Sequence, residues 1–284
     1  MISRNKGILS LNFLVPTIAF VVSLILVEGF FARVVRPAAA DIDIRGRLMA
    51  AQKSDKPFVQ ERSIYLIIKD PEQEAEIVFF FWAMAVLIYK LRGIVQERKL
   101  LKYDFVRTNL GERIIPDDAL DRYKDLRSAI EREPLWRERL LPDFVLTALH
   151  RFQMTRSIPD ASGAVKERAE LAADNLDSDL SLVRYIAWAI PALGFIGTVR
   201  GIGDALAHAE EAIKGDLNGV ISALGLAFNS TLVALLLSMV LMFVMHLLQS
   251  RQESLIIELQ TYCRDRLIDV MKVPSQEEER PVLS

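Results

Sequence analysis

Four long apolar stretches, separated by charged segments, dominate the pattern of hydrophobic and polar positions. They are residues 7–31, 77–91, 182–206 and 222–248. Each approaches or reaches the roughly 20 residues that an α-helix needs to cross the hydrocarbon core of a bilayer. The second stretch is short, but FFFWAMAVLIY is uninterrupted, and it ends on Tyr89, Lys90 and Arg92, a cluster suited to an interface. The pattern therefore predicts an all-α integral membrane protein with four transmembrane helices in a lipid bilayer.

The segments between these stretches predict the rest of the architecture. Residues 92–181 are rich in charge and carry apolar positions at helical spacing, interrupted by prolines, which indicates a domain of several helices. After the fourth stretch, apolar residues recur mostly at threes and fours up to Val270, so the helix should continue. That extension packs either on its own domain or in a bundle with the same helix of neighbouring copies. The remaining expected parts are loops at 32–76 and 207–221, and a helix with a tail at 249–284 that is disordered from Pro274 onward.

Composition and charge agree with this organisation. Hydrophobic residues make up 51% of the chain beside 25% charged residues, which is typical of a membrane protein with a soluble part. Most of the 35 Lys and Arg residues fall in the N-terminal tail, in 92–181 and after 248. Because positive charge favours the cytoplasmic side, both termini and the segment 92–181 are expected there.

The first apolar stretch has an alternative interpretation as a secretory signal. Arg4 and Lys6 precede it, and the small residues Ala38 to Ala40 follow. We favour a retained helix, because the apolar core of a signal usually has about 7–15 residues. In addition, Arg33 and Arg36 stand between this stretch and the alanines.

Enzyme and nucleic-acid chemistry have little support in the sequence. The single cysteine, Cys263, excludes a disulfide framework within the chain, and the three histidines are scattered without the spacing of metal ligands. A net charge of −2 without a basic stripe gives no reason to expect nucleic acid. We therefore assign no catalytic residue, no metal site and no cofactor, and look for the function in the membrane helices.

The third and fourth stretches each carry small residues at every third or fourth position. In IPALGFIGTVRGIGDAL, residues 190–206, the small face consists of Gly194, Gly197, Thr198, Gly201 and Ala205. In the fourth stretch it consists of Ala223, Ala227, Thr231, Ala234 and Ser238, with Ser230 beside it. Pro191 is expected to kink the third helix. Such faces either let helices pack closely or line a narrow passage with Thr198 and Thr231 as its polar groups.

Charged groups near these faces are few. The third helix has no carboxylate between Tyr185 and Val199, and the fourth has none between Ser222 and His246. If ions cross here, another chain must supply the carboxylate. Arg200 is expected to mark the outer mouth and to be neutralised by Asp204, one turn on, or by Glu28 of the first helix; Asp204 instead attracts ions if it faces the mouth.

Two segments resemble the MotA/TolQ/ExbB proton channel family. LGFIGTVRGI, residues 193–202, is similar to that family's third-helix glycine–threonine motif, and ISALGLAFNSTLVALLLS, residues 221–238, is similar to its last helix. Thr198 and Thr231 match the threonines of those helices, with Ser230 as a one-residue alternative to Thr231. The layout of four spans with a large block between the second and third is similar to MotA.

The resemblance implies a pentamer in the bacterial inner membrane, with 32–76 and 207–221 in the periplasm. Its third and fourth helices would surround two copies of a single-span partner similar to MotB, ExbD or TolR, each with an aspartate. Ions, protons or sodium, would pass the threonines and drive rotation or force. Two other hypotheses stay open: a non-conducting scaffold whose small faces only pack, and a membrane enzyme in which Glu28 and Asp204 converge with a histidine.

Overall fold

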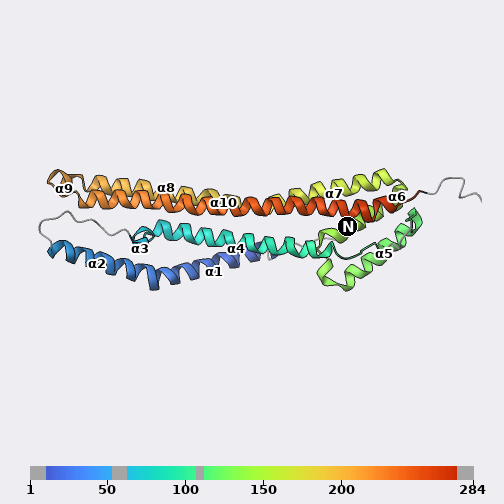
Figure 1. Ribbon diagram of the computed structural model, residues 1–284, viewed down its shortest axis with the longest axis horizontal. Coiled ribbons are helices and arrows are strands. Elements are labelled where there is room, and N and C mark those ends of the chain that lie inside the picture. Colours follow the sequence, from blue (N-terminus) through green and yellow to red (C-terminus); the bar gives the residue numbers. More distant parts are fainter. Residues whose placement is uncertain (1–10, 53–62, 107–111, 274–284) are drawn as a thin grey trace, which may run out of the picture. The chain divides into compact units, whose positions relative to one another are not determined.

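The computed structural model describes residues 11–52, 63–106 and 112–273 (Figure 1). These residues form helices joined by short turns, and their only β-type pairing is an isolated bridge between Ile114 and Met271. Four helical segments are long and apolar enough to cross a membrane: Leu14–Ile42, Pro71–Leu100, Ile158–Ala207 and Asn218–Val270. The predicted all-α class and the four membrane-spanning candidates are confirmed. The chain divides into two compact units, Met1–Tyr89 with Ser181–His246 (unit 1) and Lys90–Leu180 with Leu247–Ser284 (unit 2).

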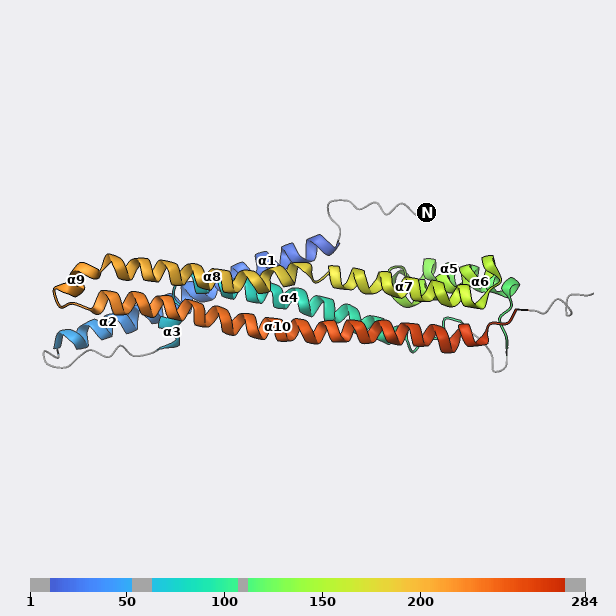
Figure 2. The same cartoon turned by 90° about the horizontal axis from the view of Figure 1, so that it is seen from above.

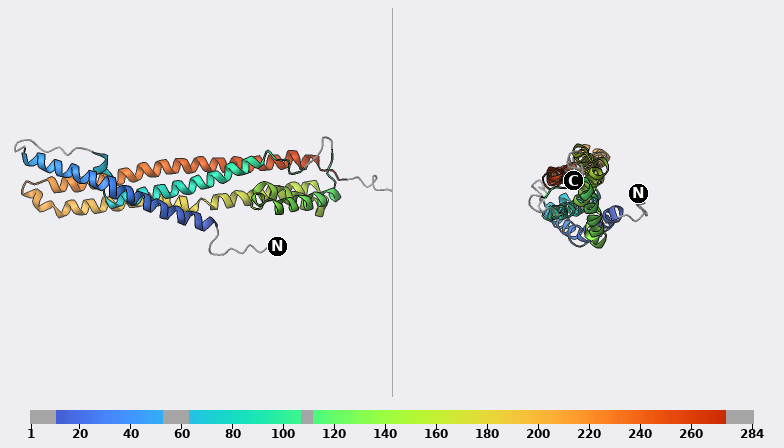
Figure 3. Two further views of the ribbon diagram at one scale, coloured as in Figure 1. Left: turned by 90° about the horizontal axis from the view of Figure 1, so that it is seen from below. Right: turned by 90° about the vertical axis from the view of Figure 1, so that its right-hand side faces the viewer.

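The first helix of unit 1 is longer than its apolar stretch. It runs as α1 (Leu11–Phe30), a π-helical turn η1 (Phe31–Val35) and α2 (Arg36–Gln52), so the expected loop at 32–76 is wrong over this part (Figure 3). The buried residues Val27, Phe31, Val35 and Ala39 recur at every fourth position. Such a stripe drifts around an α-helix of 3.6 residues per turn, and the wider π turn offsets that drift.

Helix α4 (Pro71–Leu100) also begins earlier than the predicted residue 77, shortly after the single turn α3 (Ile64–Ile67). A proline in the first turn and acidic residues beside it favour a helix start at this point. In unit 1, α4 packs against α1: the Trp82 indole nitrogen donates to the Pro16 carbonyl at 2.8 Å, and its ring lies 4.8 Å from that of Phe20.

Helices α8 (Ser181–Ala207) and α10 (Asn218–Arg266) lie side by side in unit 1 and are joined through α9 (Ala209–Ile213) (Figures 1 and 2). The expected loop at 207–221 is therefore helical over α9 and the start of α10. Helix α8 continues through Pro191, and a kink there stays a prediction. The expected continuation of the fourth helix beyond residue 248 is confirmed by the end of α10 at Arg266.

Unit 2 is a helical domain, as the helical spacing of apolar residues in 92–181 predicted. It contains α5 (Pro116–Arg132), α6 (Leu140–Thr155) and α7 (Ile158–Ser178), together with the short turns η2 (Pro134–Trp136) and η3 (Ile268–Val270) and the ends of α4 and α10. The apolar stripe on α10 is buried within this chain, as expected for a helix that packs on its own domain; its buried members are Leu248, Leu255, Ile256, Leu259, Cys263 and Leu267. Parts of four expectations lie outside the described residues: 7–10 of the first span, 53–62 of the loop, 107–111 of the helical domain and the tail at 274–284.

The burial of Cys263 gives a direct test of the packing of α10 in unit 2. Its side chain is fully buried and it is the only cysteine of the chain. We expect a polar maleimide to leave the native protein unlabelled and to label it fully in denaturant, as read by intact mass. Fast labelling of the native protein would show that the stripe is not packed on its own domain.

Candidate functional site

The small faces of α8 and α10 contact each other directly in unit 1. A methyl group added at Gly194 would lie 2.5 Å from the Cβ of Ala234, and one added at Gly201 would lie 2.8 Å from the Cβ of Ala227. Gly197 faces Ser230 in the same way. The two backbones therefore approach as closely as small-residue helix pairs allow. Within one chain, these faces are a packing surface and do not line an open passage.

The remaining small residues complete this contact. Ala205 and Ala223 are buried on either helix, and the Ser238 hydroxyl donates to the Ala187 carbonyl at 3.1 Å. Buried serine on a membrane helix commonly joins neighbouring helices through such a bond. The fourth helix is thereby fixed in register against the third.

The closeness of this contact predicts the effect of one added methyl group. Gly197→Ala would drive a Cβ into the Ser230 side chain, whereas Gly203→Ala meets nothing within 4 Å. Overpacking of this kind costs about 1–3 kcal/mol. We expect Gly197→Ala to lower the melting temperature of the purified protein, and Gly203→Ala to leave it near that of the wild type. Equal melting temperatures for both variants would contradict the packing.

The predicted polar residues Thr198 and Thr231 lie against each other at the edge of this contact. Their Oγ1 atoms share a hydrogen bond, and both side chains are half-buried. The Thr198 hydroxyl also lies 3.1 Å from the carbonyls of Gly194 and Ala227, and the Thr231 hydroxyl lies 3.3 Å from the Gly194 carbonyl. A hydroxyl donates one hydrogen and accepts through two lone pairs, so this pair can exchange hydrogen-bond partners.

Ser230, the alternative to Thr231, faces a different helix. Its hydroxyl is buried and donates to Oε1 of Glu76 on α4 at 3.5 Å. The third stretch has no carboxylate between Tyr185 and Val199 and the fourth has none between Ser222 and His246, but α4 brings one to the α8–α10 contact. The sequence prediction missed Glu76 because it placed residue 76 in a loop. The helix-start signal of Pro71, followed by the acidic residues Glu72 and Glu74, could have found it.

The partner of Arg200 in the structure also differs from the partners that the sequence predicted. Arg200 forms an ion pair with Glu72 of α4 at 2.8 Å, so the expectation of a pair with Asp204 or Glu28 is wrong. The physical reason is again the early start of α4, which brings its first turn beside α8.

The two carboxylates that were expected near Arg200 lie elsewhere in unit 1. Glu28 binds Arg36 at 2.9 Å, and Arg36 also binds Glu74 at 3.0 Å. Asp204 is exposed, and its carbonyl lies 2.8 Å from Nδ1 of His208. Over the residues that the structure describes, no three His, Cys, Asp or Glu side chains are grouped closely enough to hold a metal ion.

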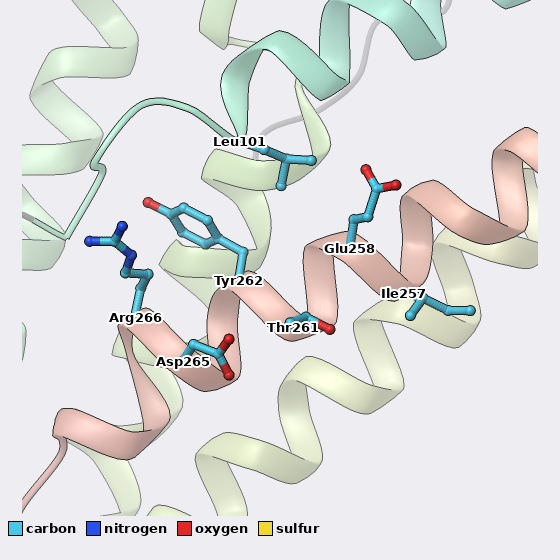
Figure 4. Close-up of a pocket in the computed structure, with 7 residues that line it drawn as sticks. All are labelled: Leu101, Ile257, Glu258, Thr261, Tyr262, Asp265 and Arg266. Carbon is cyan, nitrogen blue, oxygen red and sulfur yellow. The ribbon is translucent and has the colours of Figure 1, made fainter.

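Unit 2 has a shallow hollow in which Glu258 and Tyr262 already have structural partners. It is lined by Leu101 and by residues of α10 (Figure 4). Glu258 binds Arg98 at 2.8 Å, and the Tyr262 hydroxyl donates to the Tyr103 carbonyl at 2.9 Å. These contacts join the ends of α4 and α10, and we assign no chemistry to the hollow.

Comparison with known proteins adds one match. Residues 137–261 match the MotA/TolQ/ExbB proton channel family, a segment that contains α6, α7, α8 and most of α10. The matched segment is longer than residues 193–202 and 221–238, the two segments whose sequences resemble the family. No curated protein and no solved structure matches the chain. The fold and the match together make the chain a multi-pass membrane protein with a channel-type domain.

Proposed function

Because residues 137–261 match the MotA/TolQ/ExbB proton channel family, we propose that the chain is the ion-conducting subunit of a motor or energy-transducing complex. In this proposal it is not an enzyme, and it resides in the bacterial inner membrane with both termini in the cytoplasm. Five copies surround the membrane helices of a partner that carries an aspartate, and ion flow past α8 and α10 becomes rotation or force.

The observation that carries this proposal is the Thr198–Thr231 pair. Two hydroxyls share a hydrogen bond at the edge of an otherwise apolar helix contact, and both lie in the matched segment. Hydroxyls relay protons or coordinate ions but do not titrate at physiological pH. A pathway through this pair therefore needs a carboxylate from another chain. That carboxylate approaches the half-exposed side of the threonine pair.

The outer faces of α8 and α10 support an assembly. They expose large apolar side chains along the length of both helices in unit 1: Phe195, Ile196, Val199, Ile202, Phe228, Leu232, Leu235, Leu236, Met239 and Phe243. Surfaces of this size and composition are covered by lipid or by other helices. In the proposed ring, neighbouring copies and the partner cover part of them.

A second candidate is a non-conducting membrane scaffold. The direct contact between the small faces of α8 and α10 favours it, because packing alone accounts for the glycines and alanines. The scaffold does not need the Thr198–Thr231 hydroxyls. The two candidates therefore differ in what hydroxyl removal does.

Native mass spectrometry tests the proposed assembly. The complex is extracted gently from its own host through a tag on this chain. We expect five copies of this chain with two copies of a small single-span protein that has one intramembrane aspartate. A monomer or dimer without such a protein would contradict the proposal, and the scaffold would then be the better account.

A further inference from the structure

Two buried polar side chains of α4 have atoms that lack hydrogen-bond partners. Gln73 and Glu76 lie three residues apart on one side of the helix, and both are 0% exposed within the single chain. Neither amide atom of Gln73 has a partner among the described residues, and the same holds for Oε2 of Glu76. Buried polar groups in folded proteins nearly always have partners, so this pair points to a small ligand.

The groups that face Glu76 leave its charge uncompensated. From α10, Ser230 offers only a neutral hydroxyl to Oε1. From α4 itself, Glu72 has the same sign as Glu76, and Arg200 of α8 is paired with that residue at 2.8 Å. A buried carboxylate without a cationic partner costs several kcal/mol. Binding of a positive charge removes that cost.

A second arginine beside the first turn of α4 is already paired with carboxylates. Arg36, the cation at the α1 side, contacts Glu28 at 2.9 Å and Glu74 at 3.0 Å. Asp70 precedes the helix and adds further negative charge. Thus no basic side chain of the described residues is available to Glu76 from α1, α4, α8 or α10.

The geometry favours a proton over a metal ion. Calcium and magnesium take six or more oxygen ligands. The Glu76 environment offers its own carboxylate, one hydroxyl and one amide oxygen, because the neighbouring Glu72 carboxylate is paired with Arg200. The described part of the chain holds no grouping of three metal-ligating side chains. A proton needs only the carboxylate, and it turns Glu76 into a hydrogen-bond donor.

We propose that Glu76 is a proton-binding site of this chain, held by Ser230 of α10 and flanked by the Gln73 amide. The site goes beyond the proposed pore, because its carboxylate belongs to α4 and its hydrogen bond is to Ser230, not to Thr198 or Thr231. Loss of the proton leaves an anion beside Glu72 and weakens the contact between α4 and α10. Proton binding therefore controls the strength of the contact between α4 and α10.

Infrared difference spectroscopy of the whole complex in lipid nanodiscs, between neutral and alkaline pH, tests the site. We expect a protonated-carboxyl stretch at neutral pH that disappears reversibly at alkaline pH. This band should be lost in Glu76→Gln and retained in Glu74→Gln, the matched control whose carboxylate binds Arg36. Ser230→Ala should keep the band and shift its frequency, because it removes the hydrogen bond to Oε1.

Absence of the band from the wild type, or its persistence in Glu76→Gln, would overturn the proposal. If Glu76→Gln fails to fold, the frequency of the band in Ser230→Ala tests the proposal instead. A band at the wild-type frequency in Ser230→Ala cannot arise from Glu76 and would overturn the proposal. The spectrum is read without ion flow. A non-conducting complex would therefore refute the proposed function and leave the proton site standing.

Discussion

Thr198→Val and Thr231→Val are each expected to lower ion flux through the reconstituted complex by at least about tenfold, which corresponds to about 1.4 kcal/mol in the barrier. Valine keeps the shape of threonine and removes the hydroxyl, so the shared hydrogen bond of the pair is lost. The methyl group that replaces the hydroxyl offers an ion or a proton no partner. Flux is measured as dye-reported uptake into vesicles after a potential is applied.

The matched controls separate the hydroxyl from the packing. Thr198→Ser retains a hydroxyl at the same position and should conduct close to the wild-type rate. Thr147→Val removes a threonine of unit 2 whose hydroxyl donates to the Asp143 carbonyl of its own helix, and flux should not change. Wild-type flux in both Thr198→Val and Thr231→Val would contradict an ion pathway through this hydroxyl pair.

Arg200→Leu is expected to destabilise the protein by about 1–3 kcal/mol, the cost of a buried group that loses its partner. The side chain of Glu72 is only 13% exposed, so its carboxylate stays mostly buried after the change. The Arg200 side chain is 38% exposed, and solvent screening keeps the effect in the lower part of that range. The measurement is the free energy of unfolding in mixed micelles.

The double variant Glu72→Leu with Arg200→Leu shows whether the ion pair is the cause. We expect it to recover most of the lost stability, because it leaves no charge without a partner. The pair Asp204→Leu with Arg200→Leu is the matched control and should recover nothing. Recovery by Asp204→Leu instead would restore the sequence-based expectation that Asp204 neutralises Arg200.

The sequence predicted the features that depend on local pattern. Apolar stretches of sufficient length predicted the four long helices, and the spacing of small residues predicted the faces on which α8 and α10 meet. The positions of the hydroxyls within those faces predicted Thr198 and Thr231 as the polar groups of the two helices. Each of these inferences needs only the helical repeat and the neighbours along one helix.

The parts that the sequence did not predict depend on contacts between distant segments. Apolar stretches show where lipid begins, but a helix often extends beyond them, as α2 and the first turn of α4 do. The early start of α4 brings Glu72 to Arg200 and Glu76 to Ser230, and hydropathy contains no signal for either contact. The carboxylates near the third and fourth helices were therefore missed.

Proton uptake by vesicles that contain the purified wild-type complex decides whether this chain conducts ions. Under an inward pH gradient with a clamped potential, we expect uptake in the wild type and a reduction of at least about tenfold in Thr198→Val. A sodium gradient at equal pH shows whether sodium substitutes. An intact complex that passes neither ion would contradict the account.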